Sequence, residues 1–139
     1  MKTKIVAICL FIFISQAHAE VNEINNNKIK MLMESGVPLV DIRTEKEWHA
    51  TGVINQSKLL TFFDQDGNSN VKKWMSELQK IASKNDPVII ICRSGGRSRI
   101  VANMLDKEAN YLSVYDATNG MLSWVNSKNK TVKPVLSYR

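Results

Sequence analysis

The chain has 139 residues, of which 44% are hydrophobic, and a formal net charge of +6 at pH 7. This length is enough for one hydrophobic core. The lysines are scattered and no basic run is interleaved with aromatic residues, which argues against nucleic-acid binding, whereas the positive balance favours small anionic substrates.

Residues 1–19 have the three-part layout of a secretory signal peptide. A basic start is followed by an apolar run over 5–14 and then by Ala17-His18-Ala19, which places small residues at the cleavage positions. The apolar run is too short for a membrane span, which needs about 20 residues. We therefore expect cleavage after Ala19, a periplasmic protein with no stable membrane anchor, and one domain over 20–139.

The cysteine and histidine content restricts the chemistry of the cleaved chain. Cys9 leaves with the signal peptide and Cys92 remains, so no intramolecular disulfide can form. His49 is then the single histidine, and one cysteine with one histidine argues against a structural zinc site. An unpaired thiol in an exported protein points to reactive chemistry.

Hydrophobic periodicity divides the rest of the chain into alternating helices and strands. The expected helices lie over 24–34, 44–50, 70–83, 98–109 and a short segment bearing Trp124 after Asn119-Gly120. The expected strands are short apolar runs over 38–43, 53–54, 58–60, 88–91 and 112–115. Thr44 is followed three residues later by Glu47, which is the capping-box pattern. The core of the domain spans about 25–126, and the C-terminal tail is polar.

Strands that alternate with helices predict an α/β fold, here a parallel sheet of about five strands with helices on both faces. In such sheets, sites form at the carboxyl ends of the strands. Asp41, Arg43 and Cys92 fall at such ends. We therefore expect these three residues at one edge of the sheet.

The run Cys92-Arg93-Ser94-Gly95-Gly96-Arg97 connects a predicted buried strand to a predicted helix. Gly95 and Gly96 permit a tight turn and let backbone N–H groups point inward. With the positive end of the helix, this turn makes an anion cradle around the sulfur and favours a thiolate. The arginines of the run, and Arg99 after it, add positive potential. An inert core cysteine, which is the alternative, would not need paired glycines at a helix start.

The spacing within this loop separates two chemistries. Cysteine phosphatases place an arginine after five intervening residues, which gives a ring wide enough for phosphate. Here Arg97 follows Cys92 after only four residues. The tighter ring suits one sulfur atom carried on the cysteine and disfavours a phosphatase or arsenate reductase.

Four motifs, taken in chain order, resemble the rhodanese family of sulfurtransferases. They are Asp41-Ile42-Arg43, Glu47-Trp48 with Gly52, Cys92-Arg93-Ser94-Gly95-Gly96-Arg97-Ser98, and Asn119-Gly120-Met121-Leu122-Ser123-Trp124. The resemblance covers about residues 25–126, and the size and export signal are similar to those of single-domain periplasmic members. One difference is Ser94, which stands where some thiosulfate-using members carry a lysine.

The resemblance implies a two-step transfer that needs no metal or organic cofactor. Cys92 would attack a sulfane sulfur donor such as thiosulfate, become a persulfide, and pass the outer sulfur to a thiophilic acceptor, either cyanide or a thiol. Backbone N–H groups of residues 93–97 would hold the persulfide. Asp41 and Arg43 would form an ion pair with the loop backbone that fixes its geometry.

The alternative function is a low-turnover module that carries or senses sulfur for a partner protein. An intact cysteine and glycine loop favours the enzyme. The physiological donor and acceptor and the oligomeric state stay open at this point.

We predict that the exported protein begins at Glu20, because cleavage would follow Ala19. N-terminal sequencing of periplasmic protein measures this directly, with the uncleaved cytoplasmic precursor as the control. An exported protein that retains Lys2 would contradict the prediction.

Overall fold

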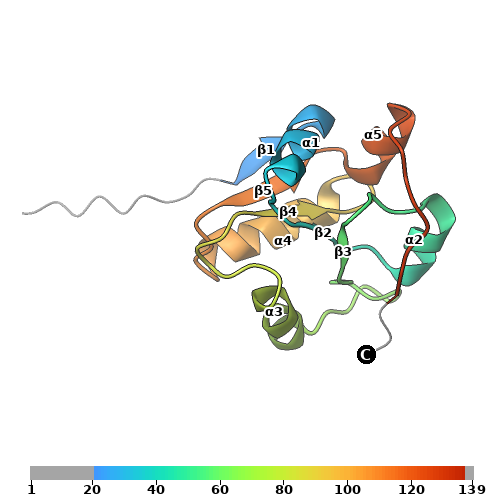
Figure 1. Ribbon diagram of the computed structural model, residues 1–139. Coiled ribbons are helices and arrows are strands. Elements are labelled where there is room, and N and C mark those ends of the chain that lie inside the picture. The colour runs from blue at the N-terminus through green and yellow to red at the C-terminus, as the bar shows by residue number, and fades with distance from the viewer. Residues whose placement is uncertain (1–20, 137–139) are drawn as a thin grey trace, which may run out of the picture.

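Four consecutive β-branched residues, Val88–Ile91, form strand β4 at the centre of the sheet. In the computed structural model, which describes residues 21–136, all four are completely buried. The strand lies between β5 and β2 in a five-stranded sheet of order β1-β5-β4-β2-β3, and every pairing is parallel (Figure 1). A strand covered on both faces is apolar on both sides, which explains why polar and apolar residues do not alternate along β4.

Strands and helices alternate along the described chain. The strands are β1 (Asn22–Ile24), β2 (Leu39–Asp41), β3 (Lys58–Leu59), β4 (Val88–Ile91) and β5 (Val114–Ala117). The helices are α1 (Asn26–Glu34), α2 (Glu45–Thr51), α3 (Val71–Gln79), α4 (Gly96–Lys107) and α5 (Gly120–Asn126). The predicted α/β fold with a parallel five-stranded sheet is confirmed. The predicted signal peptide, 1–19, lies outside the described residues.

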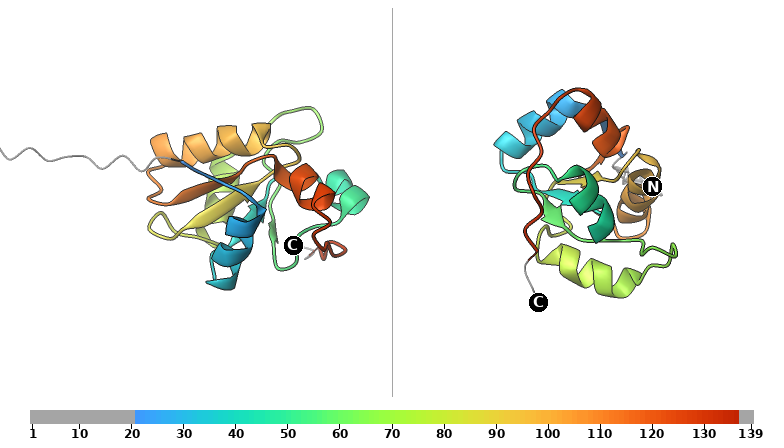
Figure 2. Two further views of the ribbon diagram at one scale, coloured as in Figure 1. Left: turned by 90° about the horizontal axis from the view of Figure 1, so that it is seen from above. Right: turned by 90° about the vertical axis from the view of Figure 1, so that its right-hand side faces the viewer.

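Alternating side chains of the central strand divide the core into two halves. Val88 and Ile90 belong to a cluster with buried residues of α3 and α4. Ile89 and Ile91 belong to a second cluster, with buried residues of α1 and α5. Helices therefore cover both faces, as predicted, and Figure 2 shows α4 and α1 on opposite sides of the sheet. Within residues 21–136, no helix has the length and apolar character needed to cross a membrane.

The membership of the sheet differs from the prediction at its edges. Strand β1 was not expected from the sequence because it has only three residues, two of them exposed, and it forms by pairing with β5. The predicted strand 53–54 is outside the sheet, and Val53 instead forms an isolated antiparallel bridge with Val132 of the C-terminal segment. Strand β5 begins two residues later than predicted, and α4 begins two residues earlier.

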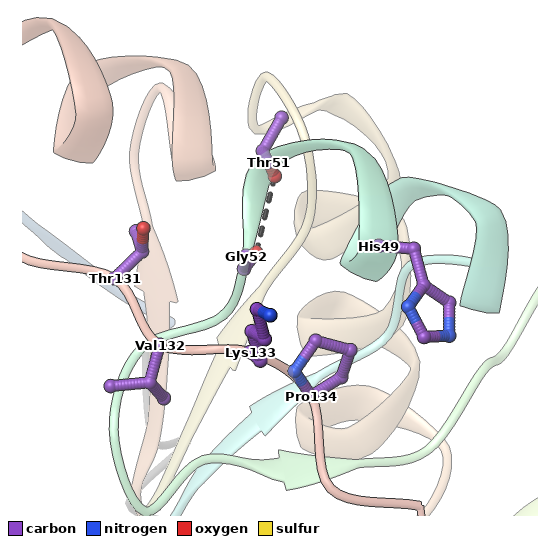
Figure 3. A pocket seen from close by; sticks show the side chains of 7 residues that line it. All are labelled: His49, Thr51, Gly52, Thr131, Val132, Lys133 and Pro134. Atoms are coloured by element: carbon purple, nitrogen blue, oxygen red, sulfur yellow. Dashed lines mark hydrogen bonds between the residues drawn. The ribbon is translucent and has the colours of Figure 1, made fainter.

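The C-terminal segment, residues 127–136, packs against the end of α2. Figure 3 shows Thr131 and Val132 beside Gly52, the residue that ends this helix. The segment is held by backbone hydrogen bonds of 2.9 Å in both directions between Val53 and Val132. The Trp124 indole N–H also donates to the Lys130 carbonyl at 3.0 Å. Part of the predicted polar tail is therefore tied to the domain.

The first turn of α5 lies against the peptide that follows β4, and Gly120 makes this approach possible. Gly120 has φ +53°, and an added Cβ would collide with the Cys92 carbonyl oxygen and lie 2.7 Å from the Arg93 carbonyl. We predict that Gly120→Ala lowers the free energy of unfolding by about 3 kcal/mol, through positive φ and overpacking together. Urea denaturation measures this change.

Gly67→Ala provides the matched control for this substitution. Gly67 also has a positive φ, +81°, but an added Cβ would meet nothing within 4 Å. Its cost should be limited to the backbone conformation, about 1 kcal/mol. Equal losses for the two variants would show that the contact with the cysteine loop is not tight.

Candidate active site

Cys92 follows directly after β4 and is fixed between two elements. Its residue is 1% exposed. Its carbonyl oxygen accepts a hydrogen bond of 2.9 Å from the Met121 N–H, and the Arg93 carbonyl accepts one of the same length from the Leu122 N–H. The start of the loop is therefore tied to the first turn of α5, which holds the sulfur at the carboxyl end of the sheet.

The loop turns around the sulfur through Gly95. This residue has φ +98°, in the left-handed region that favours glycine, and its N–H donates to Cys92 Sγ at 3.1 Å. Helix α4 begins at Gly96, and no side chain caps it. The positive end of a 12-residue helix therefore lies at the loop, where it favours negative charge. Of the other predicted loop residues, Arg93 and Ser94 are exposed and Arg97 is partly buried.

The arginines near the cysteine have different partners. Arg97 makes a bidentate ion pair with Glu47, at 2.9 Å and 2.5 Å. Arg99 pairs with Glu23 and with Asp116. Arg93 makes no ion pair with any residue in the described range. The sequence predicted three arginines that attract anions, but two of these charges are balanced by carboxylates that lie far away in the sequence.

Glu47 joins the cysteine loop to α2. Its carboxylate accepts hydrogen bonds from the Thr44 N–H and hydroxyl, which completes the predicted capping box, and it also receives Arg97. Partial burial alone would raise the pKa of Glu47, but the hydrogen bonds from Arg97 and Thr44 outweigh it and lower the pKa to about 2. The same hydrogen bonds with Glu47 raise the pKa of Arg97, against the opposing effect of burial. The pair is therefore fully charged at neutral pH.

Asp41 and Arg43 form the predicted ion pair, but it anchors α2 and not the loop backbone. The two side chains meet through Nε–Oδ1 at 2.9 Å and Nη2–Oδ2 at 2.6 Å, and both are 1% exposed. The remaining guanidinium hydrogens go to the Glu47 and Gly52 carbonyls and to the Thr51 hydroxyl. The expectation of a direct contact with the loop is wrong, because the hydrogen bonds of both side chains go to each other and to residues 43–52. Arg43 affects the loop through α2 and Glu47.

Ser98 and Asp116 are buried beside the sulfur, and the sequence did not single them out as site residues. Ser98 Oγ lies 3.5 Å from Cys92 Sγ and donates to Asp116 Oδ1 at 2.6 Å. While its proton is directed to Asp116, the hydroxyl can accept from a Cys92 thiol but cannot donate to a thiolate. Asp116 could have been found from the sequence, because it is an acidic residue near the end of an apolar strand. The same pattern identified Asp41 as a candidate.

Comparisons with known proteins agree with this geometry. The sequence model of the rhodanese-like domain matches residues 25–127. The chain is 25% identical over 112 residues to thiosulfate sulfurtransferase 18 of Arabidopsis thaliana, covering 77% of this chain and 80% of the relative. It is 28% identical over 120 residues to rhodanese-like domain-containing protein 17 of the same plant, covering 82% and 74%. The chain belongs to the rhodanese family, as its motifs indicated.

Solved structures show the same fold. A rhodanese-like domain protein from Staphylococcus aureus superimposes with a TM-score of 0.56 at 25% identity, covering 75% of this chain and 91% of the other. The polysulfide-sulfur transferase of Wolinella succinogenes, a homodimer, superimposes with a TM-score of 0.63 at 18% identity, covering 83% and 80%. The second likeness concerns the fold alone. Across residues 21–136, no three His, Cys, Asp or Glu side chains are grouped as a metal site requires.

We predict that the stabilisation contributed by Glu47 is present above pH 4.5 and is lost as pH falls toward 2. The pKa of this carboxyl is lowered from 4.5 to about 2 on folding, so acid must protonate a group that the folded state holds ionised. Because the pair is partly exposed, we expect about 1–2 kcal/mol at pH 7. Glu47→Gln should lose this amount at pH 7 and little at pH 2.5, measured by urea denaturation. The exposed Glu34→Gln is the control, and a Glu47→Gln loss that does not change with pH would contradict the prediction.

We also predict that Asp116→Asn increases the rate at which iodoacetamide alkylates Cys92 at pH 6.5, by about tenfold. The substitution removes a buried negative charge near the sulfur and leaves the Ser98 hydroxyl only neutral acceptors, the new amide oxygen and the Gly95 carbonyl, so that donation to a thiolate becomes favourable. Adding Ser98→Ala to Asp116→Asn should reverse part of the gain, whereas a purely Coulombic effect would leave it intact. Alkylation at or below the wild-type rate in a folded Asp116→Asn protein would contradict the prediction.

Proposed function

We propose that the protein is an exported sulfurtransferase that moves a sulfane sulfur from an anionic donor to a thiophilic acceptor through a persulfide on Cys92. The observation that carries the proposal is the hydrogen bond of 3.1 Å from the Gly95 N–H to Cys92 Sγ at the start of α4. This bond favours negative charge on the sulfur, which is what a nucleophile at this position needs. The name of the Arabidopsis relative supports thiosulfate as one donor.

The proposed transfer proceeds by two displacements at sulfur. In the first, the Cys92 thiolate attacks the outer sulfur of thiosulfate, an S–S bond forms, and sulfite leaves with the electron pair of the old S–S bond. In the second, cyanide or a thiolate attacks the outer sulfur of the persulfide, and the electron pair returns to Cys92. Each step conserves electrons, so no external oxidant or reductant is needed. Backbone N–H groups of residues 93–97 would hold the persulfide.

Arg93 is the residue best suited to bind the anionic end of the donor. It is exposed, it is adjacent to Cys92, and it makes no ion pair within the described chain. Arg97 could take this role only by releasing Glu47, with which it makes two short hydrogen bonds. That engagement also argues against a phosphatase, which would need the arginine of the loop for its substrate.

A sulfur carrier or sensor for a partner protein is the second candidate. The near-complete burial of Cys92, 1% exposed, favours low turnover with free thiols, because only an acceptor that fits the loop could take the sulfur. The periplasm, reached through the predicted signal peptide, is the proposed location for either function. Turnover of the purified protein with thiosulfate and cyanide distinguishes an enzyme from a carrier.

We predict that thiosulfate adds about 32 Da, one sulfur atom, to the cleaved protein and that cyanide removes it as thiocyanate. Intact mass spectrometry and a thiocyanate assay measure the two steps. Cys92→Ser should abolish both, and Arg93→Gln should slow the first. Because Ser94 replaces a lysine found in some thiosulfate-using members, polysulfide is the second donor to be tried. Failure of both donors, or thiocyanate production by Cys92→Ser at the wild-type rate, would refute the proposed function.

A further inference from the structure

A pocket of about 310 Å³ lies between α2 and α5, next to the start of the cysteine loop. Figures 1 and 2 show these two short helices side by side at one end of the molecule. Arg93, the residue after Cys92, contributes to the lining of the pocket. The volume is at the lower end of the range for small-molecule sites, so the pocket suits a compact organic molecule.

One wall of this pocket is apolar and open to solvent. Leu122 and Val125 line it from α5, and each is 43% exposed. They are three residues apart and therefore lie on one face of the helix. Met121, which is buried, and Ala50 of α2 extend the apolar surface. A ligand with a hydrocarbon part would shield these side chains from water.

The charged residues at the pocket leave a positive excess. Lys46 and Arg93 are both exposed and make no ion pair with any residue of the described chain. The other two charged lining residues are occupied, since Glu47 holds Arg97 and Arg43 holds Asp41. An apolar wall beside two available cations is complementary to an organic anion.

We propose that this pocket binds aliphatic thiols that carry a carboxylate and that these are the sulfur acceptors of Cys92. The inference rests on the proposed function and gives its acceptor a chemical class. Thiosulfate and cyanide contain no hydrocarbon, so Leu122 and Val125 would contribute nothing to their binding. The acceptor thiolate attacks the outer sulfur of the Cys92 persulfide, the new S–S bond forms on the acceptor, and the old one breaks with its electron pair returning to Cys92.

The acceptor test starts from protein that already carries the persulfide. Its desulfuration by mercaptoacetate, mercaptobutanoate and mercaptohexanoate is followed by intact mass, with each rate corrected for the thiolate fraction of the acceptor. Each methylene placed against the apolar wall should raise the rate about fourfold at subsaturating concentration. An aminothiol and a mercaptoalcohol of the length of mercaptohexanoate should each react at least about fivefold more slowly than it does.

Variants divide the effect between the apolar wall and the charge. Leu122→Ser and Val125→Ser should remove most of the dependence on chain length, and Lys46→Gln should remove most of the preference for the carboxylate. The matched controls are Leu112→Ser, at a residue that is 58% exposed before β5, and Lys107→Gln on α4. Both controls lie outside the pocket and should behave as wild type. Unchanged persulfide formation from thiosulfate in each variant shows that the cysteine loop is intact.

A binding measurement separates this inference from the proposed function. Cys92→Ser cannot form a persulfide, so titration of this variant with hexanoate, followed by NMR, tests the pocket alone. Shifts at Leu122 and Val125 with hexanoate, and none with acetate or hexylammonium, support it. If a persulfide forms but desulfuration is independent of chain length and charge, the acceptor class is wrong while sulfur transfer stands. If no donor forms a persulfide, the proposed function fails and the acceptor role fails with it. The hexanoate titration then still shows whether the pocket binds organic anions.

Discussion

The carboxylate of Glu47 is the contact on which the geometry of the cysteine loop depends. It closes the first turn of α2 through Thr44 and holds Arg97 at the far end of the loop. The buried Asp41–Arg43 pair holds the same helix through the Glu47 carbonyl in its first turn and the Gly52 carbonyl at its end. A buried ion pair is costly to break on one side because the remaining charge is left without a partner. The loop is therefore held from α2 as well as from α5.

Opposing influences meet at the sulfur of Cys92. The Gly95 N–H and the start of α4 favour a thiolate, whereas Ser98, with its proton directed to Asp116, is placed to accept from a thiol. Arg99 compensates the charge of Asp116 from the other side. The hydrogen bonds at the sulfur thus involve Gly95 and Ser98, whereas Arg97 and Arg99 are engaged by carboxylates. A count of charges along the sequence overstates the positive field.

Features determined by neighbouring residues could be predicted from the sequence, and those determined by distant partners could not. The apolar run of β4, the capping box at Thr44 and the glycine turn after Cys92 are local patterns, and each is present in the structure. The Glu47–Arg97 pair joins residues 50 positions apart, and no periodicity reports such a contact. Strand β1 is too short and too polar to show a strand pattern in the sequence. It is defined by its pairing with β5.

That pairing of β1 with β5 also has consequences for how the chain folds. Asn22 lies opposite Tyr115, so the first strand joins the sheet beside the last one. The loop that must close between them contains the three other strands, and closing a loop of this length costs entropy before any contact repays it. Proteins dominated by contacts between distant residues fold slowly. During synthesis this sheet cannot be completed until nearly the whole domain is available, because Asn22–Ile24 has no strand to pair with until Val114–Ala117 has been made.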